Sequence, residues 1–95
     1  MPAYIISYDL NKEREGYSAA NKALNDAIRN LSGTRCKPLE SFWVIVTDIS
    51  ASAIRDALLP YLDDNDELLV IRSGIESAWT RSFSPEVSAW LKKHL

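Results

Sequence analysis

The sequence predicts one small α+β domain, and three observations predict it. Apolar, β-branched runs that suit strands alternate with segments whose apolar residues recur at helical spacing. The order divides into two strand-helix-strand halves, which pack naturally as one sheet with both helices on a single face. The 95 residues leave room for one core only. We therefore expect a ferredoxin-like βαββαβ sandwich over residues 1–74, with an additional C-terminal helix in an extension of residues 75–95.

The first strand is expected over residues 3–10, which are rich in aromatic and β-branched side chains, with Asp9 at its C-terminal end. Residues 12–16 form a charged connection. The apolar residues of the next segment then return at helical spacing as far as Ser32. Gly33 directly follows this helix, so we expect it to be the C-cap.

The middle of the chain predicts two further strands. Pro38 cannot donate a ladder hydrogen bond, so a strand over residues 34–39 is short or lies at an edge. Residues 41–47 are apolar at successive positions, which indicates a strand covered on both faces. Two helices on one face leave the other uncovered, and the simplest cover is a second copy of the chain.

The remaining elements follow from capping and turn signals. Ser50 or Ser52 caps a second helix that ends near Pro60, and the acidic turn at residues 63–66 leads into a strand over residues 67–73. Ser84 and Pro85 then open a final amphipathic helix that runs to about His94.

Composition excludes several classes of protein. Cys36 and His94 are the only cysteine and histidine, so neither an internal disulfide nor a Cys/His zinc site can form. No apolar run approaches the roughly 20 residues of a membrane span, and residues 1–3 lack a secretory n-region, so we expect a cytoplasmic protein. A net charge of −2 disfavours extensive neutralisation of nucleic-acid phosphates, so only a local basic patch could serve.

Several short motifs carry a family resemblance that covers roughly residues 3–72. They are Tyr8-Asp9 at the end of the first strand, Ser41-Phe42-Trp43-Val44, and Asp63-Asp64-Asn65-Asp66 before Leu69-Val70-Ile71. The pattern resembles the superfamily of the CRISPR-associated protein Cas-two and virulence-associated protein D. The tract Ile75-Glu76-Ser77-Ala78-Trp79 looks closer to the second branch.

The resemblance implies a homodimeric, metal-dependent endoribonuclease acting on single-stranded RNA. Asp9 would be both the catalytic and the metal-binding residue, with the carboxylates of two subunits meeting at a divalent ion. Mg²⁺ suits such a site, because it needs only one or two carboxylates beside phosphate oxygens. The candidate nucleic-acid-binding residues are Asn11, Arg14, Arg35, Lys37 and Arg72.

Each of these residues also has a purely structural interpretation. A carboxylate or an Asn after a strand commonly forms a turn, and dispersed cations commonly solvate a surface. Trp43 and Trp90 fall in regular apolar patterns, which indicates core or interface positions. The alternative function is therefore a non-catalytic dimeric adaptor or protein-interaction domain of an adaptation or toxin-antitoxin module.

Overall fold

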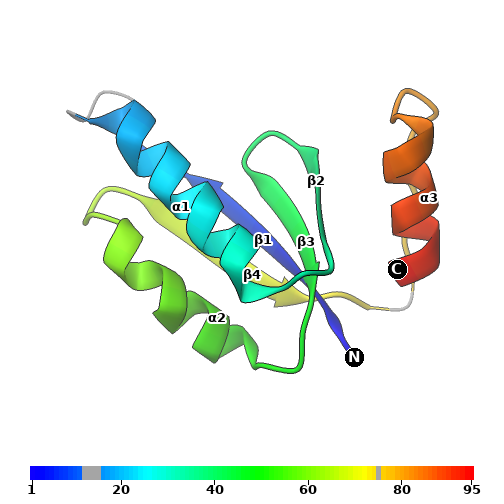
Figure 1. Ribbon diagram of the computed structural model, residues 1–95, viewed down its shortest axis with the longest axis horizontal. Coiled ribbons are helices and arrows are strands. Elements are labelled where there is room, and N and C mark those ends of the chain that lie inside the picture. The colour runs from blue at the N-terminus through cyan, green and yellow to red at the C-terminus, as the bar shows by residue number, and fades with distance from the viewer. Residues whose placement is uncertain (12–15, 75) are drawn as a thin grey trace.

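A computed structural model describes residues 1–11, 16–74 and 76–95, and it has an α+β fold. A four-stranded antiparallel sheet is combined with three helices, and the strands lie in the order β2-β3-β1-β4 (Figure 1). In chain order the elements are β1 (Ala3–Asp9), α1 (Tyr17–Leu31), β2 (Arg35–Leu39), β3 (Phe42–Val46), α2 (Ala51–Leu58), the 3₁₀ turn η1 (Leu59–Tyr61), β4 (Glu67–Arg72) and α3 (Pro85–His94).

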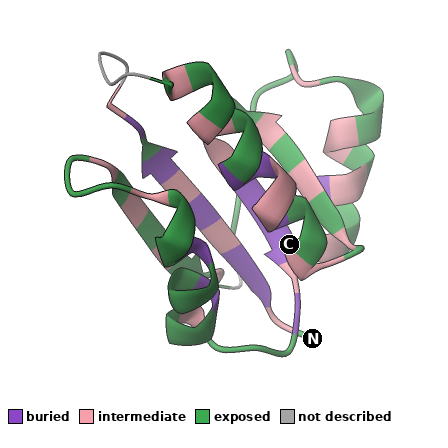
Figure 2. Cartoon of the chain, turned by 60° about the vertical axis from the view of Figure 1, so that its left-hand side comes forward, coloured by how far each residue is buried: buried purple, intermediate pink, exposed green. Residues whose placement is uncertain are grey.

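β1 is the central strand, and it pairs antiparallel with both β3 and β4. Its side chains alternate between two environments, as the pleat of a strand requires. Tyr4, Ile6 and Tyr8 are buried on the face that carries α1 and α2. Asp9 lies at the end of the strand and is exposed. The purple and pink colouring of β1 in Figure 2 reflects this central position.

The main core lies between the sheet and the helix pair α1 and α2, so the prediction that both helices cover one face is confirmed. The helices contribute Leu24 and Ile28 from α1 and Ile54 and Leu58 from α2, all fully buried. Ile45 of β3 meets them from the sheet. Both helices are therefore amphipathic: their apolar side packs on the sheet, and their polar side faces solvent.

The second face of the sheet is covered in part by α3 of the same chain, which lies beside β2 and β3 and away from α1 and α2 (Figure 1). Leu91 of α3 is buried against Ala3 and Val44, with Trp90 and other partly buried apolar residues around them. A second copy is therefore not what covers this half, and that expectation was wrong. The half formed by β1 and β4 stays open, where Leu69 is 57% and Ile71 47% exposed.

The helix ends follow the capping signals except at one place. The Ser50 hydroxyl accepts from the Ala53 N–H at 3.1 Å, which resolves the choice between Ser50 and Ser52. Ser84 caps α3 in the same manner. Gly33 is not a left-handed C-cap, because Ser32 ends α1 in an extended conformation and its hydroxyl donates to the Val46 carbonyl at 2.6 Å. The predicted charged connection falls mostly on residues 12–15, outside the described residues.

The helices are short, and their apolar residues lie in short segments. Within the described parts of the chain, no helix combines the length and the hydropathy that crossing a membrane would require.

Candidate carboxylate site

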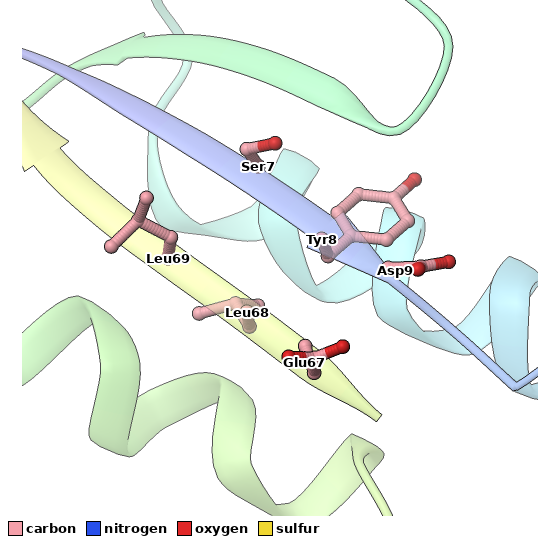
Figure 3. A pocket seen from close by; sticks show the side chains of 6 residues that line it. All are labelled: Ser7, Tyr8, Asp9, Glu67, Leu68 and Leu69. Atoms are coloured by element: carbon pink, nitrogen blue, oxygen red, sulfur yellow. The ribbon is translucent and has the colours of Figure 1, made fainter. Parts of the chain in front are cut away.

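Asp9 and Glu67 stand directly opposite each other on neighbouring strands, at the end of β1 and the start of β4. Both side chains are exposed, and both belong to the open half of the second face. With Ser7, Tyr8, Leu68 and Leu69 they line a shallow hollow (Figure 3). Directly opposed side chains have Cβ atoms about 4.5–5.5 Å apart, so two carboxylates can reach one small cation from these positions.

The neighbour of Asp9 fixes the direction in which the carboxylate points. Tyr8 is buried on the opposite face, and its hydroxyl donates to Asn25 Oδ1 at 3.0 Å. Because successive residues of a strand alternate in direction, anchoring Tyr8 in the core turns Asp9 toward solvent. Among the described residues, neither Asp9 nor Glu67 has an ion-pair partner.

Two carboxylates that stand opposite each other repel unless a cation lies between them. Hard, exposed oxygen ligands that leave room for water are the donor set that Mg²⁺ takes in proteins. The pair therefore fits a hydrated divalent cation. No group of three or more His, Cys, Asp or Glu residues that could hold a metal is found in the described residues, so the candidate ligands in this part of the chain are the two carboxylates of Asp9 and Glu67.

Asn11 lies next to this site and has a structural role there. Its backbone N–H donates to Asp66 Oδ1 at 2.9 Å, which ties the end of β1 to the acidic turn before β4. Asp66 Oδ2 also accepts from the Asp63 N–H, and Asp63 Oδ1 accepts from the Asn65 N–H. The carboxylates of the turn therefore accept hydrogen bonds from nearby backbone N–H groups. The bond from the Asn11 N–H also helps to keep Asp9 opposite Glu67.

Two of the predicted phosphate-binding cations, Arg35 and Arg72, lie far from Asp9. Arg72 pairs with Tyr4 at the other end of the sheet, and the five steps along the strand from Glu67 to Arg72 span about 17 Å. Arg35 is opposite Ile45, which is opposite Tyr4, so Arg35 lies at that far end too. Arg14 lies outside the described residues.

Lys37 belongs to a cluster of cations on the α1 flank. Its Nζ is 5.9 Å from the centre of the Trp43 ring, and the Arg29 guanidinium is 5.3 Å from it. Arg29 also pairs with Asp26 at 2.8 Å, and Lys22 reaches the same carboxylate at 2.7 Å. The hydrogen bond from Lys22 is the main reason that the pKa of Asp26 is lowered. Sequence reasoning missed Arg29, because helical spacing alone does not show which strand a helix overlies.

Three other residues that stand out in the sequence, Cys36, His94 and Trp79, have structural roles or contacts. Cys36 is half-buried, and this burial raises the pKa of its thiol. The His94 ring lies 4.4 Å from the Trp90 ring at the end of α3. The indole N–H of Trp79 donates to the Ser88 hydroxyl at 3.0 Å, so Trp79 fastens the segment before α3 to that helix.

Comparison with models of known protein families and with curated proteins finds no match to this chain.

Proposed function

We propose that this protein is a cytoplasmic, homodimeric, Mg²⁺-dependent endoribonuclease acting on single-stranded RNA, similar to the Cas-two and virulence-associated protein D superfamily. The proposal includes a ferredoxin-like architecture with an additional C-terminal helix. Its support is the strand order β2-β3-β1-β4, the antiparallel pairing throughout and the placement of α1 and α2 on one face.

The exposed pair of Asp9 and Glu67 is the observation that carries the proposal. Each subunit offers two carboxylates of its own, so an ion does not require that the Asp9 side chains of two subunits meet. A bound Mg²⁺ would orient water and offset the charge that develops on the phosphate. Asp9 and Glu67 would hold it, and Tyr8 and Asn11 would keep the two strand ends in place.

The cations would bind the RNA backbone at a distance from the cleaved bond. Lys37 and Arg29 lie beside Trp43, and Arg35 lies two residues before Lys37 on the same strand. This flank lies on the α1 face and the two carboxylates on the other face, so it would bind phosphates several nucleotides from the cleavage position, where the RNA passes around the sheet, without touching the reacting atoms. We expect its contribution to weaken as salt is raised.

The decisive experiment is cleavage of end-labelled single-stranded RNA by the purified chain with Mg²⁺, with Mn²⁺ and with EDTA. Asp9→Asn is expected to reduce metal-dependent cleavage at least about 100-fold, and Glu67→Gln about tenfold, because each removes one charged ligand. Asp64→Asn, an exposed acid of the neighbouring turn, is the matched control and is expected to leave the rate unchanged.

Binding of Mn²⁺, followed by electron paramagnetic resonance, provides a second measurement that does not depend on the choice of RNA. Wild-type protein should bind the ion, and the double variant Asp9→Asn, Glu67→Gln should not. Undiminished cleavage by the Asp9→Asn protein would contradict the proposal.

The second candidate, a non-catalytic adaptor, is favoured by one specific observation. Arg35 and Arg72 lie at the end of the sheet remote from Asp9, while apolar residues on β4 are exposed. A wild-type chain that neither cleaves RNA nor binds Mn²⁺, and that forms a stable complex with another protein of its own module, would favour this function over the nuclease.

A further inference from the structure

The two edges of the sheet differ in how they are protected. The edge strand β2 carries Arg35 and Lys37, contains Pro38, and shifts register between Cys36 and Leu39. Exposed cations, proline and irregular pairing are the features that prevent an edge from accepting another strand. β2 is therefore unsuited to further pairing.

The opposite edge, β4, lacks the proline and the irregular pairing, and its one cation, Arg72, stands at its last position. Its sequence contains neither proline nor lysine, and the strand pairs with β1 in an unbroken register over six residue pairs. Among the described residues, no other strand pairs with its outer edge. Leu69 and Ile71, both exposed, lie on this strand on the face away from α2. A regular, apolar, unpaired edge is a site for strand addition.

Space for an added strand exists on the α2 side as well. A hollow runs along β4 between residues 68–70 and the α2 residues Ala51, Ser52 and Arg55. Ala51 and Arg55 are four residues apart and so lie in one row along the helix. Side chains of a strand paired with β4 would enter this hollow on one face and lie beside Leu69 and Ile71 on the other.

We propose that the occupant is β4 of a second copy, paired antiparallel about a twofold axis at Val70. In an antiparallel pair, opposed side chains lie on the same face, so the residue numbers of each pair must have an even sum. Centring on Val70 sets Leu69 opposite Ile71 of the partner subunit, and Ile71 opposite the partner's Leu69. Leu68 then lies against the aliphatic stem of the partner subunit's Arg72. All four apolar residues of β4 gain apolar or aliphatic neighbours.

The competing register, centred on Leu69, is less favourable. It sets Glu67 opposite Ile71 of the partner subunit and so places a carboxylate against an apolar side chain. The charges also select the antiparallel direction. Parallel pairing in register would set Glu67 beside the partner subunit's Glu67 and Arg72 beside the partner's Arg72, which are two pairs of like charges, whereas the antiparallel register contains neither pair.

This inference rests on the homodimer of the proposed function and names the surface that forms it. With strand spacing near 4.8 Å and a rise near 3.3 Å per residue, the Asp9 residues of the two subunits stand roughly 20–25 Å apart. The Asp9 and Glu67 pair of each subunit would therefore bind its own metal ion, independently of the pair in the other subunit. The measurements below need neither RNA nor metal, so their failure and the failure of the nuclease proposal can be told apart.

The first test is the molar mass of the full chain, by light scattering after gel filtration and by sedimentation equilibrium. Wild type should be a dimer. Leu69→Lys with Ile71→Lys opposes like charges across the axis, and we expect dissociation to rise at least about tenfold. Leu39→Lys, at a residue 50% exposed on β2, is the matched control and should stay dimeric. A monomeric wild type, or a dimer indifferent to the β4 double variant, would overturn the inference.

The second test fixes the register by oxidative cross-linking in a Cys36→Ser background. Val70→Cys places two thiols opposite each other at the axis and should give a disulfide-linked dimer on a non-reducing gel. Leu69→Cys should not form this disulfide, because position 69 is opposite position 71 of the other copy and the two substituted positions are only diagonal neighbours. Cross-linking through Leu69→Cys alone, or through neither variant, would rule out the Val70-centred pairing.

Discussion

Asn25 is buried inside the main core and satisfies the polar groups of two aromatic residues. Its Oδ1 accepts from the Tyr8 hydroxyl at 3.0 Å and from the Trp43 indole N–H at 2.9 Å. Its Nδ2 donates to the Asn21 carbonyl at 2.7 Å, one turn earlier in α1. The amide thus joins α1 to β1 and β3 and also holds the strand end that carries Asp9.

Replacing Asn25 with Ala should destabilise the protein more than its small change in volume suggests. Two buried donors would lose their acceptor, and each unsatisfied group costs about 1–3 kcal/mol. We expect the free energy of unfolding to fall by about 2–4 kcal/mol in urea denaturation. Lys22→Ala, in the same helix and exposed, loses only a surface pair and should change it by less than about 0.5 kcal/mol. Equal effects of the two substitutions would contradict the role given to Asn25.

The two halves of the carboxylate site differ in how far the sequence predicts them. Asp9 follows from its place at the end of a recognisable strand, and its position is confirmed. Glu67 was missed, because its approach to Asp9 depends on the register between β1 and β4, and the two paired residues are 58 positions apart in sequence. A single sequence contains strand patterns but not the offset between strands.

At the scale of elements, local chemistry decides where helices begin. Ser50 and Ser52 both stand near the start of α2, and both hydroxyls suit an N-cap. The Ser50 residue has the extended backbone of a cap and bonds to the Ala53 N–H, whereas Ser52 is already inside the helix. The strands at residues 3–10, 41–47 and 67–73 were likewise recognisable from apolar runs, to within one or two residues of their ends.

The two serines provide a matched pair of substitutions. Ser50→Ala removes the acceptor for an otherwise unpaired backbone N–H, so we expect a loss of about 1 kcal/mol of stability. Ser52→Ala exchanges an interior serine for the best helix former and should change stability by less than about 0.5 kcal/mol. Thermal denaturation followed by circular dichroism measures both. A larger loss for Ser52→Ala would show that the cap lies elsewhere.

At the scale of the whole molecule, the sequence predicted two covered faces but assigned the second cover to another copy. The successive apolar residues of β3 required something on both sides, and that prediction is confirmed. The cover over β2 and β3 is α3, which no periodicity could place, because a helix after a long connection can pack on any exposed apolar surface. The reason is that docking of distant elements depends on the shape of the assembled surface.

Docking of α3 predicts a stability effect from its deepest residue. Leu91 is 3% exposed and packs on Ala3 and Val44, so Leu91→Ala should lower the free energy of unfolding by about 2–4 kcal/mol. Lys92→Ala, on the exposed side of the same helix, is the control and should have little effect. Urea denaturation measures the difference. If Leu91→Ala is as mild as the control, α3 does not form part of the core.

Pro38 and the irregular pairing of β2 also limit how large an assembly can become. A sheet with two receptive edges would add copies indefinitely and grow into a fibre, since every join would leave a fresh edge of the same kind. In the proposed dimer the one receptive edge is used when two subunits join, and the outermost strand on each side is then β2. Pro38 and the irregular pairing of β2 would then block further strand addition, so that the proposed assembly would close at two subunits.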